Sequence, residues 1–119
     1  MTIYSRVYGA LIELGLPVGH GTLLTEGGAE LPDEYLVYQL ISGVPEQHAD
    51  DEEKERSYRI QVSYYSRDGL ADLPDVNGAM KAIGGAKSAE RDLQRDPDTG
   101  HFGLAVDYIF QATEEPEGS

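Results

Sequence analysis

The chain has 119 residues, about the length that a single domain needs. Its 22 acidic and 9 basic residues give a formal net charge of −13, which argues against a broad electrostatic grip on nucleic acid or on anionic lipid. The lack of cysteine excludes disulfides, thiolate metal sites and cysteine nucleophiles. No apolar run approaches the length of a membrane span, so we expect no contact with membranes.

The first expected element is a helix over residues 3–14. Apolar residues recur there at the spacing of one buried helical face, namely at Ile3, Val7, Leu11 and Leu14. We expect the helix to stop at Gly15-Leu16-Pro17, because proline lacks a backbone donor and restricts the residue before it.

Two strands are expected next. Residues 35–41 are mostly apolar with little alternation, which is typical of a strand buried on both faces. Residues 58–65 alternate between apolar and polar, which predicts a strand with one mostly polar face. Part of residues 18–32 suits a short strand, and residues 42–57 form an acidic loop that is long for a hairpin.

The second half of the chain predicts a helix and a hairpin. The helix begins near Asp72 and ends before Gly84-Gly85, with its apolar face built from Leu73, Val76, Met80 and Ile83. Residues 87–94 are polar on both faces and suit only an edge strand. A turn at residues 96–100 then leads into an alternating strand at residues 102–110.

The order helix, strand, strand, helix, strand, strand favours an α+β fold. We expect a small antiparallel or mixed β-sheet of about four strands with the two helices packed on one face. Residues 1–112 are expected to form one domain, and residues 113–119 an acidic disordered tail with nothing to bury.

Residues with reactive or metal-binding side chains do not occur at the spacings that catalysis or metal binding needs. The three histidines, His20, His48 and His101, fall in expected loops or at a turn edge without ligand spacing, so we expect each to be solvated. The run of acids at residues 50–53 lacks the spacing of a calcium loop. We therefore expect no catalytic residues, no metal and no cofactor.

Three segments together resemble the tail-completion proteins of long-tailed bacteriophages, a family that includes the tail terminators or tail-to-head joining proteins. They are Ile3-Tyr4-x-x-Val7-Tyr8-x-x-Leu11-x-x-Leu14-Gly15-Leu16-Pro17-Val18, Pro32-x-x-Tyr35-Leu36-Val37-Tyr38 and Pro97-Asp98-Thr99-Gly100-His101. The resemblance runs from about residue 3 to residue 112, and it implies the same small α+β build without catalytic residues.

The resemblance implies a structural role in the virion tail, with the chain in the host cytoplasm before assembly. Six copies would form a ring that ends polymerization of the tail tube and joins the tail to the head connector. The implied partners are further copies of the chain, the major tail-tube protein and the head completion or connector protein, while DNA passes through without specific binding. A head-tail connector, a minor capsid component and an acidic adaptor that mimics DNA remain alternatives.

Two sets of residues are candidates for contacts in such an assembly. The first helix and the polar edge strand supply expected subunit contacts, and Tyr65 joins them because it falls on a polar strand face with no core to enter: Tyr4, Tyr8, Tyr65, Lys87, Ala89 and Arg91. The acidic loop is the expected docking segment for the tail-tube protein, through Glu46, Asp50, Asp51, Glu52, Glu53 and Glu55.

Overall fold

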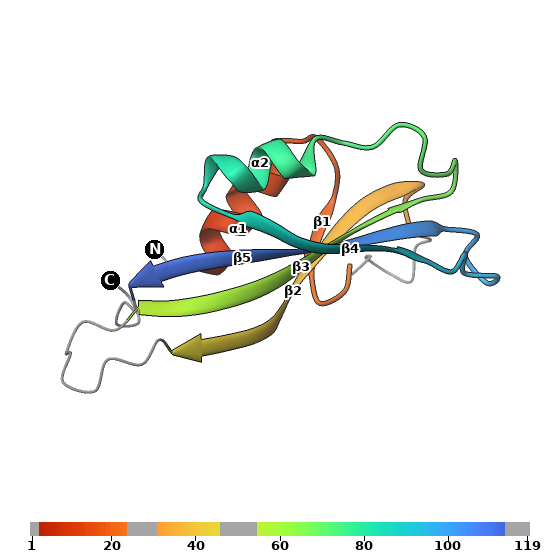
Figure 1. Cartoon of the computed structure of the whole chain (residues 1–119). Coiled ribbons are helices and arrows are strands. Elements are labelled where there is room, and N and C mark those ends of the chain that lie inside the picture. The colour runs from red at the N-terminus through yellow and green to blue at the C-terminus, as the bar shows by residue number, and fades with distance from the viewer. Residues whose placement is uncertain (1–2, 24–30, 46–54, 114–119) are drawn as a thin grey trace.

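The computed structural model describes residues 3–23, 31–45 and 55–113. Five strands form one sheet, and both helices lie on the same side of it (Figure 1). The helices are α1 (Ile3–Ile12) and α2 (Val76–Ala82). The strands are β1 (Val18–His20), β2 (Glu34–Pro45), β3 (Glu55–Ser66), β4 (Ala86–Leu93) and β5 (Phe102–Thr113). The expected α+β class and the single helical layer are confirmed, with β1 as a fifth strand.

The sheet has the order β1-β2-β3-β5-β4. Only β1 and β2 are parallel; every other neighbouring pair is antiparallel. The sheet is therefore mixed, and β1 and β4 stand at its two ends. Because β1 has only 3 residues while β2 has 12, β1 covers just a part of the β2 edge.

The core lies between the helices and one face of the sheet, which we call the helix face. Alternate residues of the three long strands point to it, and α1 buries Ile3, Val7 and Leu11 against them. The α1 helix ends at Ile12, two residues before the end that the sequence predicts, and Gly15 takes a positive φ of 84° in the turn that follows.

The second helix is shorter than predicted. It begins at Val76 because Asp75 caps it, with one Asp75 carboxylate oxygen accepting from the Gly78 amide at 3.0 Å. Leu73, expected on the buried face of this helix, instead precedes it and is 48% exposed. The predicted stop at Gly84-Gly85 is confirmed, since the helix ends at Ala82 and Gly84 has a φ of 94°.

The strands β2 and β3 extend further than predicted, so that only residues 46–54 of the expected long loop lie outside strands, and these are also outside the described residues. Burial on both faces holds for Tyr35 to Tyr38 but not beyond them, because Leu40 and Ile41 are exposed. The turn at residues 96–100 is confirmed: the Asp96 amide donates to the His101 carbonyl at 2.9 Å. The β5 strand continues to Thr113, one residue into the expected tail.

Candidate functional site

One candidate surface joins α1 to the outer side of β2. We call it the apolar edge: the side chains of Tyr8, Leu40 and Ile41 together with the backbone of β2 at residues 39–45. The Tyr8 ring is 44% exposed, and its centroid lies 6.4 Å from that of Tyr38. Leu40 follows Tyr38 on the same face of β2 and is 38% exposed. Apolar side chains from a helix and from a strand therefore meet solvent on one side of the molecule.

The backbone of the apolar edge is open because β1 is so short. The β1 strand pairs with Leu36, Val37 and Tyr38, and the Gly21 amide then donates to the Tyr38 carbonyl at 2.9 Å. Among the described residues, no strand pairs with the outer side of residues 39–45. This stretch also lacks any charged residue, although exposed strand edges are usually blunted by charge.

Tyr4 contributes to this side of the molecule through an aromatic stack. The exposed imidazole of His20 lies parallel to the Tyr38 ring at 4.7 Å between centroids, and the Tyr4 ring lies 5.3 Å from His20. Burial, and then the nearby Tyr8, raises the pKa of Tyr38. The Tyr4 side chain is thus partly covered by contacts within its own chain, whereas more of the Tyr8 side chain is exposed to solvent.

The opposite side of the sheet ends in β4, which we call the charged edge. Its residues from Ala86 to Asp92 are all exposed, and Lys87 forms an ion pair with Glu90. The pairing of β4 with β5 shifts register around Ser88, which indicates a β-bulge. The predicted edge strand is confirmed, and the candidates Lys87, Ala89 and Arg91 all lie on it.

A hollow of about 260 Å³ opens beside the charged edge, on the helix face. Its walls come from β3, β5, Glu90 of β4 and the segment that leads into α2, and the exposed Leu73 belongs to its lining. The Tyr108 hydroxyl donates a hydrogen bond to Asn77 at this site. Burial, followed by Glu90 and Asp75, raises the pKa of Tyr108 to about 12, so the hydroxyl stays neutral at physiological pH.

Tyr65 lies on the face of the sheet away from the helices, which we call the open face. Its ring stacks on Tyr35 with centroids 4.9 Å apart, and Tyr35 in turn meets the edge of His101 at 5.2 Å. Tyr65 is half-buried in this group, so it has packing partners that the sequence did not predict. The expectation that Tyr65 contacts another subunit remains a prediction.

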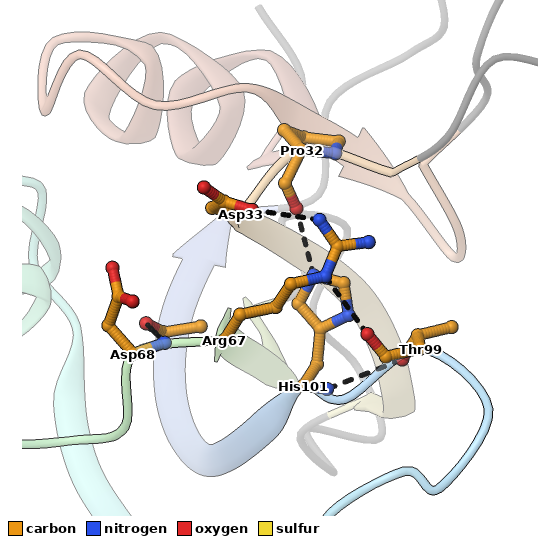
Figure 2. Close-up of polar contacts among 7 residues, drawn as sticks. Pro32, Asp33, Arg67, Asp68, Thr99 and His101 are labelled. Atoms are coloured by element: carbon orange, nitrogen blue, oxygen red, sulfur yellow. Dashed lines mark hydrogen bonds and ion pairs between the residues drawn. The ribbon is translucent and has the colours of Figure 1, made fainter.

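His101 contradicts the expectation of a solvated histidine, because it is only 2% exposed. Its Nε2 lies 2.8 Å from the carbonyl oxygen of Pro32 (Figure 2), and its Nδ1 has no hydrogen-bond partner. The histidine is buried because the 96–100 turn folds it against the beginning of β2 and the Tyr35 ring. His20 is exposed as expected, and His48 lies outside the described residues.

Arg67 ties three chain segments together at the same end of the sheet (Figure 2). Its Nη1 donates to Asp33 at 2.8 Å, and its Nε donates to the Thr99 carbonyl at 2.9 Å. We call this group, with His101 on Pro32, the polar clamp. Asp33 directly precedes β2 and Thr99 lies in the turn before β5, so the clamp holds these strand ends in place.

Polar side chains also cross the open face from strand to strand. Gln39 donates to Gln61 at 3.2 Å, and Gln61 donates to Asp107 at 3.2 Å. Arg59 lies 4.0 Å from Asp107 and donates to Ser88 of β4 at 2.9 Å. We call these five residues the polar ladder. Gln61 and Asp107 are buried within it, so the polar face of β3 is not simply solvated.

The structure separates the predicted interface residues into distinct places. Tyr4 and Tyr8 lie at the β1–β2 side of the sheet, Lys87, Ala89 and Arg91 lie at the β4 side, and Tyr65 lies on the open face. The docking-loop candidates Glu46, Asp50, Asp51, Glu52 and Glu53 are outside the described residues, and Glu55 is the first residue of β3.

Leu40 and Leu73 are the surface residues that the sequence did not reveal. Both occur within apolar patterns that predicted burial. Leu73 is exposed because α2 begins after it, and Leu40 is exposed because β1 does not pair with β2 beyond Tyr38. The usable signal for Leu73 was Asp75, which caps a helix beginning at residue 76 and leaves Leu73 outside it.

The described residues contain no group of three or more histidine, aspartate or glutamate side chains placed to hold a metal ion. Neither helix of the described chain has the length and apolar character that crossing a membrane requires.

Comparison with known proteins identifies no family. No family model matches the chain, and no curated protein matches it. Among solved structures, the chain is similar to a chain from the virion of a native gene transfer agent particle. The TM-score is 0.47 and the sequence identity is 15%, with 93% of this chain and 92% of that chain covered.

Proposed function

We propose that this chain is a noncatalytic assembly protein of a phage or prophage tail. It forms a ring, a homohexamer by the resemblance, that ends polymerization of the tail tube and joins the tail to the head connector. The sequence resemblance to tail-completion proteins suggests the role. The observation that supports it best is the presence of two unlike strand edges on opposite sides of one small sheet, the outer side of β2 beyond Tyr38 and the outer side of β4, with which no strand pairs in the part of the chain that the structure describes.

Two unlike edges favour a ring over a symmetric dimer. A contact between different surfaces of identical chains repeats from copy to copy, and it closes into a ring when the rotation between copies divides a full turn. The predicted contact residues Tyr8 and Arg91 lie at opposite edges of the sheet. They can belong to one subunit interface only if the chains associate in this head-to-tail manner.

The charge of the chain suits a ring around a DNA channel. With a net charge of −13 per copy, acidic side chains facing the channel would repel phosphate and prevent DNA from adhering. DNA would then pass through without specific binding. The proposed docking segment for the tail-tube protein is the acidic loop, and deleting residues 48–55 is expected to leave the fold intact and to abolish capping.

The test is electron microscopy of a tail-tube protein from the same genome, polymerized with and without this chain. Tubes of defined length that end in a ring of this protein are the expected result. Tubes that grow on unaffected, with no density at their ends, would contradict the terminator role and favour a head-side connector or a minor capsid component.

A double variant connects this test to the structure. Substituting Tyr4 and Tyr8 with serine removes the aromatic surface of α1 without touching the buried Val7 and Leu11. Ring formation should be lost while the circular dichroism spectrum is retained. Unchanged rings would remove α1 from the interface.

A further inference from the structure

We infer that the apolar edge of one copy adds as an antiparallel strand to the charged edge of the next copy, with Leu40 seated in the hollow beside Leu73. The occupant of the hollow is therefore a second copy of this chain. This inference rests on the proposed ring, and it specifies which surfaces meet and how the strands run.

Strand directions within one sheet already favour the antiparallel arrangement. The β2 strand is antiparallel to β3, β3 to β5, and β5 to β4, so β4 runs opposite to β2. If neighbouring copies are related by rotation about an axis roughly along the strands, then β4 of one copy meets β2 of the next in opposite directions. Antiparallel pairing is the more stable kind per residue, and it needs no inversion of the subunit.

The two open edges also agree in length, provided that neighbouring copies are staggered. The charged edge has 8 residues, and the open part of β2 spans residues 39–45. Within one copy, Leu93 is level with Tyr35 of β2 and Ala86 is level with Ser42, through their shared partners in β3 and β5. Neighbouring copies must therefore be displaced along the strands, and such a displacement is what strand tilt in a closed barrel requires.

The side chains at the two edges are complementary in shape and polarity. Leu40 pairs with the buried Ile60 across the strands, so Leu40 points to the helix face. The hollow beside Glu90 opens on that same face, with Leu73, Leu104 and Val106 in its lining. A strand added at the charged edge would thus bring Leu40 to the side on which the hollow lies, and burying Leu40 against Leu73 would remove both exposed leucines from water.

The two strands that would meet carry no net charge, although the chain as a whole is strongly acidic. Residues 39–45 carry no charge, and β4 carries two basic and two acidic residues, which cancel. The remaining negative charge of the chain lies outside the two strands that would meet. Copies that repel one another over most of their surface can therefore still approach along these two edges.

The absence of cysteine in the chain allows a direct test by cross-linking. Two single variants, Leu40→Cys and Leu73→Cys, are prepared with tags of different size, mixed at high concentration and treated with a short thiol cross-linker. Both side chains are substantially exposed, so the variants should fold. Asp98→Cys, in the exposed turn between β4 and β5, is the control for random collisions.

A cross-linked pair that contains one chain of each tag, at several times the yield of the Asp98→Cys control, is the expected result. The double variant Leu40→Cys/Leu73→Cys should give a ladder of cross-linked species that ends at the ring. Pairs formed only between identical variants, or no product above the control in chains with native circular dichroism, would overturn the inference.

The inference and the proposed function can fail separately. If the heterotypic cross-link forms but tail tubes are not capped, the contact stands and the tail role is wrong. If tubes are capped but only identical variants cross-link, the tail role stands and the proposed pairing of edges is wrong.

Discussion

The helix face and the open face of the sheet are buried by different means. On the helix face, apolar side chains such as Val62 and Phe110 pack against α1 and α2. On the open face, Gln61 and Asp107 are buried. Gln61 accepts a hydrogen bond from Gln39, Asp107 forms an ion pair with Arg59, and both of these neighbours reach solvent. Polarity along a strand therefore indicates which residues share a face, whereas burial depends on what the neighbouring side chains cover.

The largest difference between the faces should appear when a side chain is removed from the helix face. Leu11→Ala empties space at a fully buried position on α1 and should lower the free energy of unfolding by about 2–5 kcal/mol. The control Ile12→Ala lies next to it on the exposed side of the helix and should change stability by no more than about 0.5 kcal/mol. Denaturant unfolding measures both, and equal effects would contradict the buried position of Leu11.

On the open face, the effects of substitutions in the polar ladder on the free energy of unfolding should depend on one another, because its side chains are hydrogen-bonded to each other. Gln61→Leu and Asp107→Leu each leave a buried partner without its hydrogen bond, and each should cost about 1–3 kcal/mol. The double variant replaces both partners with apolar groups and should cost less than the sum of the two. Strict additivity in the double-mutant cycle would mean that the two side chains do not interact.

The smallest effect on the free energy of unfolding is expected for Tyr108, which is buried by apolar packing and also makes a hydrogen bond. Tyr108 packs in the core, yet its hydroxyl donates to Asn77, and Tyr108→Phe should cost about 1 kcal/mol at neutral pH. Its pKa rises from 10.0 to about 12 on folding. Between these values the unfolded chain has released a proton that the folded chain retains. The contribution of Tyr108 to stability is therefore constant below pH 10 and is lost as the pH rises from 10 to about 12.

Alkaline unfolding curves test this pH dependence. Tyr35, Tyr38 and Tyr64 also have pKa values raised mainly by burial, so they share in the fall of stability, and Tyr108→Phe should make that fall shallower without abolishing it. An unchanged slope between pH 10 and 12 would show that Tyr108 titrates alike in the folded and unfolded chain.

Much of the fold follows from patterns in the sequence. The spacing of apolar residues and the positions of glycine and proline predict α1, the long strands and the 96–100 turn, because these signals act locally along the chain. The candidate surfaces are harder to predict. The exposure of Leu40 depends on how far β1 reaches along β2, and the burial of His101 depends on contacts with Pro32 and Tyr35, which are distant in sequence. Such long-range contacts leave no periodic signal.

Because of the polar clamp, the two ends of the sheet are held together by different contacts. At one end of the sheet, Arg67 fastens Asp33 and Thr99 together. At the other end, β2, β3 and β5 continue as paired strands to Pro45, Arg56 and Ala112, beyond the last pairing of β4 at Ala86 (Figure 1). Side-chain hydrogen bonds thus join strand ends at one end of the sheet, whereas three strands are held by backbone pairing at the other. We expect the end that Arg67 joins to be the less flexible of the two, and hydrogen exchange should be slower there.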